Sequence, residues 1–421
     1  MKDELDDLLK KSGLDALLIV GPASHNAPMV YFTGPAHVDG CLVKRKGQPP
    51  VLFCLPMERE EAARTGVDTR MLDWSGFNQT AAGDPVELEV LILQHILMEA
   101  GATGNVAVFG RMDAGHAFSV FQKLGERMPT VQLQGRSDGR SPLRAARITK
   151  DRAEVDRIRR VGKITVEIVA AVVDFLTSQR AEGNRLVTRA GEPVTVGDVK
   201  RRIRLMAAER GVEMPEGLIF SVGRDAGVPH SSGQDGDPIS IGVPVLLDIY
   251  PCEAGGGYFY DFTRTWCLGH APDEAAELHG LVLEAHRRAL AALRPGVTGR
   301  SIQQQTCDWF ESHGHPTTRS DPKTLSGYVH SLGHGVGLDI HEPPALRDAV
   351  EGEEELRPGM VFAVEPGLYY PDRGLGMRIE DTVWLRPDGK PEILADYPTD
   401  LVLPLRPRRA PRKVGVRAAR R

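Results

Sequence analysis

The chain has 421 residues, of which 41% are apolar, so it can bury a core large enough for two or three domains. A net charge of −5 and five scattered cysteines argue against a protein made mainly to bind nucleic acid, a disulfide framework and a CxxC zinc site. The charged, acidic N-terminus does not resemble a signal peptide, and no apolar run approaches the ~20 residues that span a membrane. We therefore expect a cytoplasmic protein without membrane contact.

Residues 1–140 alternate short helical and extended patterns, which predict a small α/β domain. The predicted elements are a helix near 3–12, strands at 16–20, 41–43 and 51–54, a helix at 86–100, a strand at 106–109 and a helix at 114–128. We find no catalytic constellation in this region. His25, Asp113 and His116 lack partners at ligand spacing, so we expect surface or structural roles for them.

A polar stretch at 135–142 combines Gly, Ser and Pro, which is typical of a linker. The predicted helices beyond it lie at 151–178, 196–209, 272–293 and 301–313. A predicted strand at 218–222 leads through a loop with His230 to a hairpin that carries Asp248 and Asp261. Because helices are interleaved with antiparallel hairpins, we expect the α+β class for this second domain.

The hairpin places one carboxylate on each of two neighbouring strands. Asp248 ends an apolar strand, residues 255–257 are three glycines that mark a turn, and Asp261 lies on the next strand, which we expect to open at Tyr258. A buried carboxylate is costly unless it is paired or bound to a cation. Taken alone, the hairpin also fits a solvated loop whose acids cap or pair locally.

The hairpin pattern recurs later in the chain. Glu365 ends a second apolar strand, a glycine-containing turn follows, and Glu380 lies on the next strand shortly before Thr382. Two half-domains of similar design would bring the four carboxylates together, with His334 between them in the sequence. We therefore expect one shared site.

Four carboxylates and one imidazole in a core would repel one another unless cations were present. Oxygen donors with a single histidine suit Mn, Co, Fe or Zn in the +2 state better than a thiolate zinc site does. Five ligands, some of them bridging, fit two ions roughly 3.5–4 Å apart, which lower the pKa of a bridging water. The expected reaction is hydrolysis of an acyl bond.

Three segments carry a family resemblance: residues 332–343 around His334, residues 358–367 around Glu365, and Arg378-Ile-Glu380-Asp-Thr382. They resemble the signatures of the pita-bread metallopeptidases, and among these the prolidase and aminopeptidase P subgroup. The resemblance covers about residues 150–405 and implies two pseudo-symmetric halves around a curved antiparallel sheet. Residues 1–140 fit the smaller creatinase-type N-terminal domain by size and position.

The resemblance also implies roles for single residues. The implied metal ligands are Asp248, Asp261, His334, Glu365 and Glu380, with Asp261 and Glu380 bridging both ions. Glu365 would also be the general base. The implied catalytic or substrate-binding residues outside the ligand set are His230, His330, His341, Tyr369 and Arg378. For His330 and Tyr369, ordinary core or rim positions remain the alternative.

The resemblance finally implies an Xaa-Pro exopeptidase that acts on dipeptides, as prolidase does, or on longer peptides, as aminopeptidase P does. It would use two divalent ions, Mn before Co, Zn or Fe, and would form a homodimer. One alternative is a non-catalytic binding protein of this fold, which usually lacks ligands. Another is a hydrolase or lyase of this fold that acts on a non-peptide small molecule.

Residues 406–421 carry eight Lys or Arg and no acid, so the rest of the chain is more acidic than the net charge indicates. This composition predicts a disordered tail. Weak, salt-sensitive contact with nucleic acid is the minority alternative for the tail.

Overall fold

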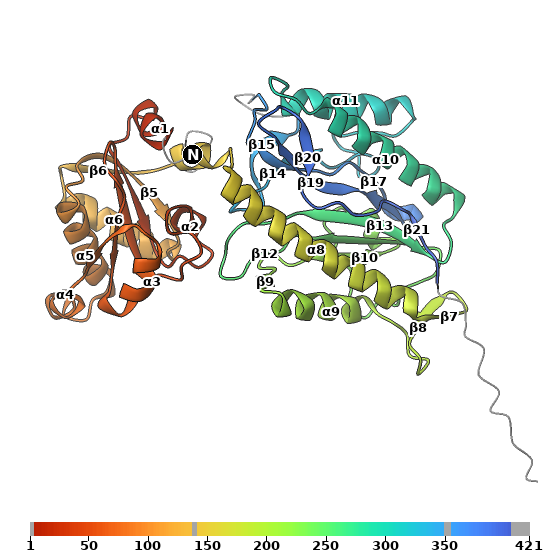
Figure 1. Ribbon diagram of the computed structural model, residues 1–421, viewed down its shortest axis with the longest axis horizontal. Coiled ribbons are helices and arrows are strands. Elements are labelled where there is room, and N and C mark those ends of the chain that lie inside the picture. Colours follow the sequence, from red (N-terminus) through yellow and green to blue (C-terminus); the bar gives the residue numbers. More distant parts are fainter. Residues whose placement is uncertain (1–3, 137–140, 349–354, 406–421) are drawn as a thin grey trace, which may run out of the picture.

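The structure is a computed structural model that describes residues 4–136, 141–348 and 355–405. Figure 1 shows two lobes, one coloured red to orange and one coloured yellow to blue, which are joined by helix α7 (Pro142–Arg147). Across these described ranges, no helix has the length and apolar character needed to cross a membrane. The predicted tail at 406–421, and residues 137–140 of the predicted linker, lie outside the described residues.

The first lobe is built on a six-stranded sheet with the order β4-β3-β2-β1-β5-β6. Its strands are β1 (Ala16–Val20), β2 (Gly40–Arg45), β3 (Val51–Cys54), β4 (Asp68–Met71), β5 (Gly104–Gly110) and β6 (Val131–Gly135). Its helices are α1 (Leu5–Lys11), α2 (Ala27–Thr33), α3 (Arg59–Arg64), α4 (Trp74–Ala81), α5 (Pro85–Glu99) and α6 (Ala114–Arg127). Every element predicted for this region is present, and α2, α3, α4, β4 and β6 are additional.

Two of the polar residues singled out in this lobe have structural roles. Asp113 caps α6, because its side chain accepts hydrogen bonds from the backbone N–H groups of Gly115 and His116. His25 pairs across to the second lobe, with 3.1 Å between its Nε2 and Glu213 Oε1. Both outcomes agree with the structural roles expected from the sequence.

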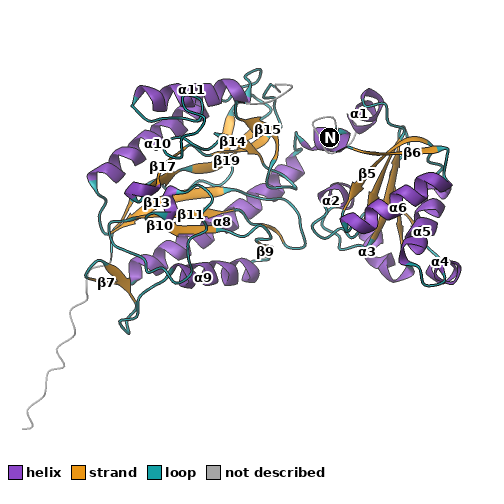
Figure 2. Cartoon of the chain, turned by 180° about the vertical axis from the view of Figure 1, so that it is seen from behind, coloured by secondary structure: helices purple, strands orange, loops and turns teal. Residues whose placement is uncertain are grey.

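Four long helices of the second lobe begin and end within two residues of the predicted bounds. They are α8 (Arg152–Ser178), α9 (Val196–Glu209), α10 (Asp273–Ala292) and α11 (Gly299–Ser312). The start of α8 is fixed by a capping box, in which Asp151 and Glu154 each accept a hydrogen bond from the other's backbone N–H. Figures 1 and 2 show these helices packed around a central sheet.

The central sheet has nine strands, and its main path runs β10-β11-β13-β19-β16-β14-β15. These strands are β10 (Ile219–Val222), β11 (Pro244–Ile249), β13 (Phe262–Leu268), β14 (Gly333–Gly335), β15 (Glu342–Leu346), β16 (Val361–Val364) and β19 (Glu380–Leu385). Two short strands join its sides, β20 (Pro391–Ile393) on β19 and β21 (Val402–Leu403) on β13. Every pairing on the main path is antiparallel, as the α+β prediction requires.

The two halves proposed from the repeated pattern meet in the middle of this sheet. The β11–β13 pair lies beside the β16–β19 pair, and β13 contacts β19 directly, with Thr263 opposite Glu380. A separate two-stranded sheet, β17 (Gly367–Tyr370) with β18 (Leu375–Arg378), forms the turn of the second half. The pattern of an apolar strand, an acid, a turn and a second acid therefore does describe two facing halves.

The prediction that the second strand of the first half opens at Tyr258 was wrong, because β13 begins at Phe262. Residues 252–253 instead form β12 (Cys252–Glu253), which pairs with β9 (Val212–Glu213). The backbone of Phe259 donates to the Gly337 carbonyl (2.8 Å), and that of Tyr260 donates to Pro251 (3.0 Å). The aromatic run is buried like a strand, but its hydrogen bonds go to β12 and to loops, outside the central sheet.

The two lobes share one continuous apolar core. The cluster includes Tyr31 and Phe32 from α2, Leu143 from α7 and Val155 from α8. The small hairpin of β7 (Arg180–Glu182) and β8 (Arg185–Val187) completes the second lobe. Because α7 lies inside this shared core, the segment between the lobes is a packed part of the structure. The division into domains at 1–140 and 150–405 stays a prediction.

Candidate active site

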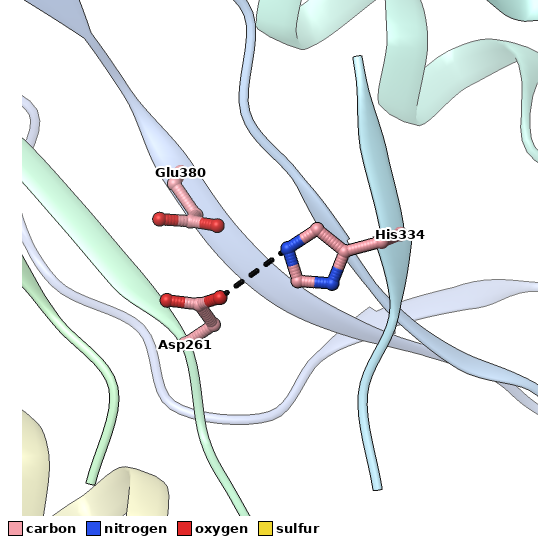
Figure 3. Close-up of side chains that lie close together, drawn as sticks. All are labelled: Asp261, His334 and Glu380. Carbon is pink, nitrogen blue, oxygen red and sulfur yellow. Dashed lines mark ion pairs between the residues drawn. The ribbon is translucent and has the colours of Figure 1, made fainter. Parts of the chain in front are cut away.

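Three of the five predicted metal ligands have side chains that point at one another. Asp261 lies just before β13, His334 in the middle of β14, and Glu380 at the first position of β19. One ligand atom from each lies within 4.8 Å of the others, and His334 Nε2 is 3.5 Å from Asp261 Oδ2. Figure 3 shows the three side chains converging from three separate segments.

The position of His334 depends on its glycine neighbours. A Cβ on Gly333 would lie 2.0 Å from the Ala363 carbonyl oxygen, and one on Gly335 would lie 2.2 Å from the Pro343 carbonyl oxygen. Only glycine permits such close approach of the backbones that flank β14. The Gly-His-Gly sequence therefore brings the imidazole deep between two strands.

Glu365 and Asp248 complete the predicted ligand set. Glu365 directly follows β16, and its Oε1 is 3.4 Å from His334 Nε2. Asp248 lies in β11 opposite Thr263, and its Oδ2 accepts a hydrogen bond from Arg378 Nη2. The five residues thus gather in one place, with Asp248 turned toward Arg378.

The four carboxyl groups are buried, with exposed fractions of 8% or less. Burial raises the pKa of each one, and the charges of neighbouring carboxylates raise those of Asp261, Glu365 and Glu380 further. Arg378 opposes this shift in all four groups. One cation does not balance four buried acids.

Unpartnered atoms indicate what the cluster can bind. Within the described ranges, three buried carboxylate oxygens accept no hydrogen bond: Asp248 Oδ1, Glu365 Oε1 and Glu380 Oε1. His334 Nδ1 lies 3.1 Å from the Gly335 carbonyl oxygen, which can only accept, so Nδ1 carries the proton and the Nε2 lone pair faces the carboxylates. Burial, with the charge of His341, lowers the pKa of His334 to about 4.

Lone pairs that face one another in a buried cluster repel unless a cation lies between them. Carboxylate oxygens and one neutral imidazole are the donors that divalent ions such as Mn, Co, Fe or Zn accept. The residues present therefore fit a site for divalent metal ions.

Arg378 connects the cluster to the surrounding residues. It is 1% exposed and donates to the Tyr369 hydroxyl (2.9 Å), the Pro229 carbonyl (3.2 Å) and Thr263 Oγ1 (3.2 Å), besides Asp248. Burial raises the pKa of Tyr369 to about 12, so the hydroxyl keeps its proton at neutral pH. Arg378 and Tyr369, both predicted from the resemblance, therefore adjoin the predicted ligands.

The three other predicted histidines surround the same cluster. His330 Nδ1 is 3.0 Å from the Ser331 carbonyl and 3.5 Å from Glu365 Oε2, and its Nε2 is 3.2 Å from His230 Nε2. With the proton of His330 on Nδ1, His230 donates to His330. The ring of His341 lies against that of His334, with 4.3 Å between the centroids. Tyr369 is therefore a buried core residue and His330 a half-buried one, and both adjoin the cluster.

Thr263 and Arg264 support the ligands from β13, a role that was not expected from the sequence. Thr263 Oγ1 donates to Glu380 Oε2 (2.6 Å). The Arg264 guanidinium makes five hydrogen bonds, to the carbonyls of Thr263, Glu380, Tyr397 and Pro398 and to Asp381 Oδ1. The available signal for this role was a run of three polar residues, Thr263 to Thr265, in a strand that is buried along its whole length.

Comparison with known proteins identifies the family. Residues 156–387 match the model of metallopeptidase family M24, and residues 2–147 match the creatinase/prolidase N-terminal domain. An Xaa-Pro dipeptidase of Pyrococcus furiosus is 25% identical over 393 residues, which cover 92% of this chain and 97% of the relative. Xaa-Pro aminopeptidase 1 of Streptomyces coelicolor is 28% identical over 395 residues, which cover 87% and 76% of the two chains.

The fold has solved counterparts as well. The crystal structure of a dipeptidase from Pyrococcus horikoshii matches with a TM-score of 0.73 at 21% identity, and it covers 95% of this chain and 99% of that one. At this identity the likeness concerns the fold, which is the pita-bread fold with a creatinase-type N-terminal domain. The family model spans more than half of the chain and includes all of the clustered acids. The protein is accordingly a member of metallopeptidase family M24.

Proposed function

We propose that the protein is a two-metal exopeptidase that hydrolyses the Xaa-Pro bond of dipeptides or of short peptides. The observation that carries the proposal is the set of buried, unpartnered carboxylate oxygens around the His334 lone pair. The proline requirement comes from the names of relatives, an Xaa-Pro dipeptidase and an Xaa-Pro aminopeptidase. Neither name decides between dipeptides and longer substrates.

In this proposal Asp248, Asp261, His334, Glu365 and Glu380 would hold two divalent ions. When bound, the ions supply a water of lowered pKa and stabilise the negative charge that develops on the scissile carbonyl. Manganese is our first expectation, before cobalt, zinc or iron. A full set of five ligand-type side chains argues against a non-catalytic binding protein.

The remaining chemistry belongs to side chains around the ligands. Besides holding an ion, Glu365 would accept a proton from the attacking water and return it to the proline nitrogen as the bond breaks. His341, at the exposed rim of the cluster, is positioned to donate a hydrogen bond to a substrate oxygen. His230 and His330 form a hydrogen-bonded pair beside Glu365, which suits the binding of substrate.

Arg378 and Tyr369 hold protons next to Asp248 and the His230 loop. Because Arg378 donates to both Asp248 and the Pro229 carbonyl, it keeps the loop that precedes His230 near the ligands. Xaa-Pro substrates lack the amide N–H that most peptidases engage. A fixed set of donors would therefore bind the carbonyl oxygen of the substrate. The homodimer and the cytoplasmic location stay predictions.

The direct test is an assay of purified protein on Xaa-Pro dipeptides and Xaa-Pro tripeptides after metal removal, with and without added Mn. We expect hydrolysis only with metal, and much slower hydrolysis of the matched Xaa-Ala peptides. Cleavage of dipeptides alone would identify a prolidase, and cleavage of tripeptides an aminopeptidase P. No hydrolysis of any Xaa-Pro peptide by fully metal-loaded protein would overturn the proposal.

A second assay tests the role of His341. The His341→Ala variant should keep its metal content and lose about 10²–10³-fold in kcat, the usual loss for a donor that stabilises developing negative charge. The His116→Ala variant, on α6 of the first lobe, is the control. An unchanged kcat for His341→Ala would remove this residue from the mechanism.

A further inference from the structure

A second buried ionic cluster lies next to the active site and contains residues from the segment between the lobes. Glu342 opens β15 directly after His341, and its side chain is 3% exposed. Its Oε1 accepts from Arg147 Nη2, and its Oε2 accepts from Lys150 Nζ (3.0 Å). Arg147 ends α7 and Lys150 follows it, with side chains only 6% and 2% exposed. We call these three residues the linker clamp.

The linker clamp contacts the loop of residues 336–341 through hydrogen bonds and close packing. The backbone N–H of Asp339 donates to Glu342 Oε1 (3.1 Å), and Asp339 Oδ2 accepts from Arg147 Nη2 (2.6 Å). A Cβ on Gly337 would lie 2.3 Å from Glu342 Oε2, so the loop backbone folds directly over the carboxylate. The loop is therefore shaped around a carboxylate fixed by two cations of the linker.

The charges in the linker clamp keep it ionised. Burial alone would raise the pKa of Glu342, but Arg147 and Lys150 lower it to about 2. Because Arg147 and Lys150 each bind one carboxylate oxygen, the side chain of Glu342 faces these two cations. Buried ion pairs of this kind fix one arrangement of the chain more than they add stability.

Both ends of the loop held by the linker clamp lie at or next to active-site residues. It begins after His334, a predicted metal ligand, and ends at His341, whose ring lies 4.3 Å from that of His334. The β14–β15 register shifts at His334 and Gly335, so the strand pairing alone does not fix the loop. The backbone of Phe259 adds a single hydrogen bond to Gly337 (2.8 Å).

We propose that Arg147, Lys150 and Glu342 are positioning residues that set the place of His341 and thereby couple the segment between the lobes to turnover. The proposal rests on the proposed function for its catalytic readout. None of the three side chains needs to touch substrate. Their effect passes through the loop to the imidazole of His341.

The first test is the Lys150→Met variant, which keeps the length of the side chain and removes one of the two cations. We expect kcat on Xaa-Pro substrate to fall about 10- to 100-fold, the usual range for partners that orient a functional side chain, with metal content unchanged. Lys163→Met is the matched control, since Lys163 lies exposed on α8. The control should keep full activity.

A double-mutant cycle separates positioning from general damage. If Lys150 acts through His341, adding Lys150→Met to His341→Ala should lower kcat by less than about 2-fold further. A structural effect unrelated to His341 would multiply the two losses instead, and that result would overturn the proposal. If Lys150→Met fails to fold, Arg147→Lys takes its place in the test, because it keeps the charge and loses the fork geometry of the guanidinium.

Hydrogen exchange gives a readout that needs no activity, so it stands even if the proposed function fails. Amides of residues 336–341 should exchange at least about 10-fold faster in Lys150→Met than in wild type or Lys163→Met, with the rest of the second lobe unchanged. Equal exchange of this loop in all three proteins would overturn the proposal. Absence of Xaa-Pro hydrolysis in wild type would overturn only the proposed function.

Discussion

Glu342 and Glu380 are both buried in the second lobe, yet their surroundings shift the pKa values of their carboxyl groups in opposite directions. Arg147 and Lys150 lower the pKa of Glu342 to about 2. Burial, followed by the charges of Glu365 and Asp248, raises that of Glu380 well above its usual value. The difference lies in whether the protein supplies the cations itself.

Around Glu342 the protein provides two cations for one buried carboxylate, and both carboxylate oxygens are bonded. Around Glu380 the described residues provide one cation, Arg378, for four carboxylates, and three of their oxygens have no partner among these residues. The first arrangement is complete in the folded chain, and the second is complete only with ions from solution. This contrast distinguishes a structural ion cluster from a metal site where burial alone does not.

The sharpest way to break the comparison is to remove the acids that the ions would share. The Asp261→Ala plus Glu380→Ala double variant should lose its bound metal and at least about 10³-fold in activity, since loss of one stabilising donor alone costs 10²–10³-fold. The metal content measured by elemental analysis after metal reconstitution should fall from two ions per chain to near zero. Full metal content in the double variant would show that the ions bind elsewhere.

The second largest effect should come from the linker clamp. Glu342→Ala removes the buried carboxylate from Lys150 and leaves Arg147 paired with the exposed Asp339, and breaking a buried pair in this way typically costs about 3–5 kcal/mol. Denaturant unfolding of the metal-free protein measures the change in free energy. Asp388→Ala, which removes an exposed carboxylate on a turn, is the control and should change little. A cost near that of the control would mean that the ionic bonds of the linker clamp contribute no stability.

The metal site should respond to neutralisation with the opposite sign. In metal-free protein, Asp261→Asn removes one of several repelling buried charges, so it should stabilise the fold by about 0.5–2 kcal/mol, as functional-site substitutions often do. The same variant should bind metal weakly. Destabilisation of the metal-free protein by Asp261→Asn would indicate that the cluster is already satisfied without ions.

Sequence patterns predicted the elements with strong periodicity and the residues that the known motifs contain. Helix α9 matches its predicted bounds. Thr195 caps its N-terminus, and its buried residues recur along one face. The acids of the site were also recognisable, since an apolar strand that ends in an acid breaks the expected pattern. The predicted repetition of strand, acid and turn corresponds to the two hairpins that meet at β13 and β19.

Other features depend on contacts between distant segments, which one sequence does not reveal. Tyr258 to Tyr260 has the composition of a strand, but its backbone groups bond to residues 251 and 337, so it lies outside the sheet. The linker clamp joins residues 192 and 195 positions apart, and Arg147 and Lys150 look like ordinary surface cations in the sequence. Arg264 is similar, because its five acceptors lie in three separate segments, at Thr263, at 380–381 and at 397–398.

The smallest expected effect is a difference in pH dependence between the two clusters of metal-free protein. The folded pKa values of Asp261, Glu365 and Glu380 lie well above their usual values of 3.8, 4.5 and 4.5, so these groups favour the fold fully below those values and lose this contribution as pH rises through the folded pKa. Glu342 has a folded pKa of about 2 against a usual 4.5, so its contribution is present above 4.5 and is lost only as pH falls toward 2.

Between about pH 5 and pH 8, therefore, the linker clamp contributes a constant amount and the metal-site acids make the metal-free protein less stable as pH rises. Glu380→Gln should flatten this slope, because one titrating group is removed, whereas Asp388→Ala should leave it unchanged. Added Mn should reverse the slope, since the ions bind only deprotonated carboxylates and a neutral imidazole. Unfolding free energies of metal-free and metal-loaded protein across this range give the measurement. Equal slopes for wild type and Glu380→Gln would mean that the buried acids titrate as they do in the unfolded chain, and the contrast between the two clusters would then fail.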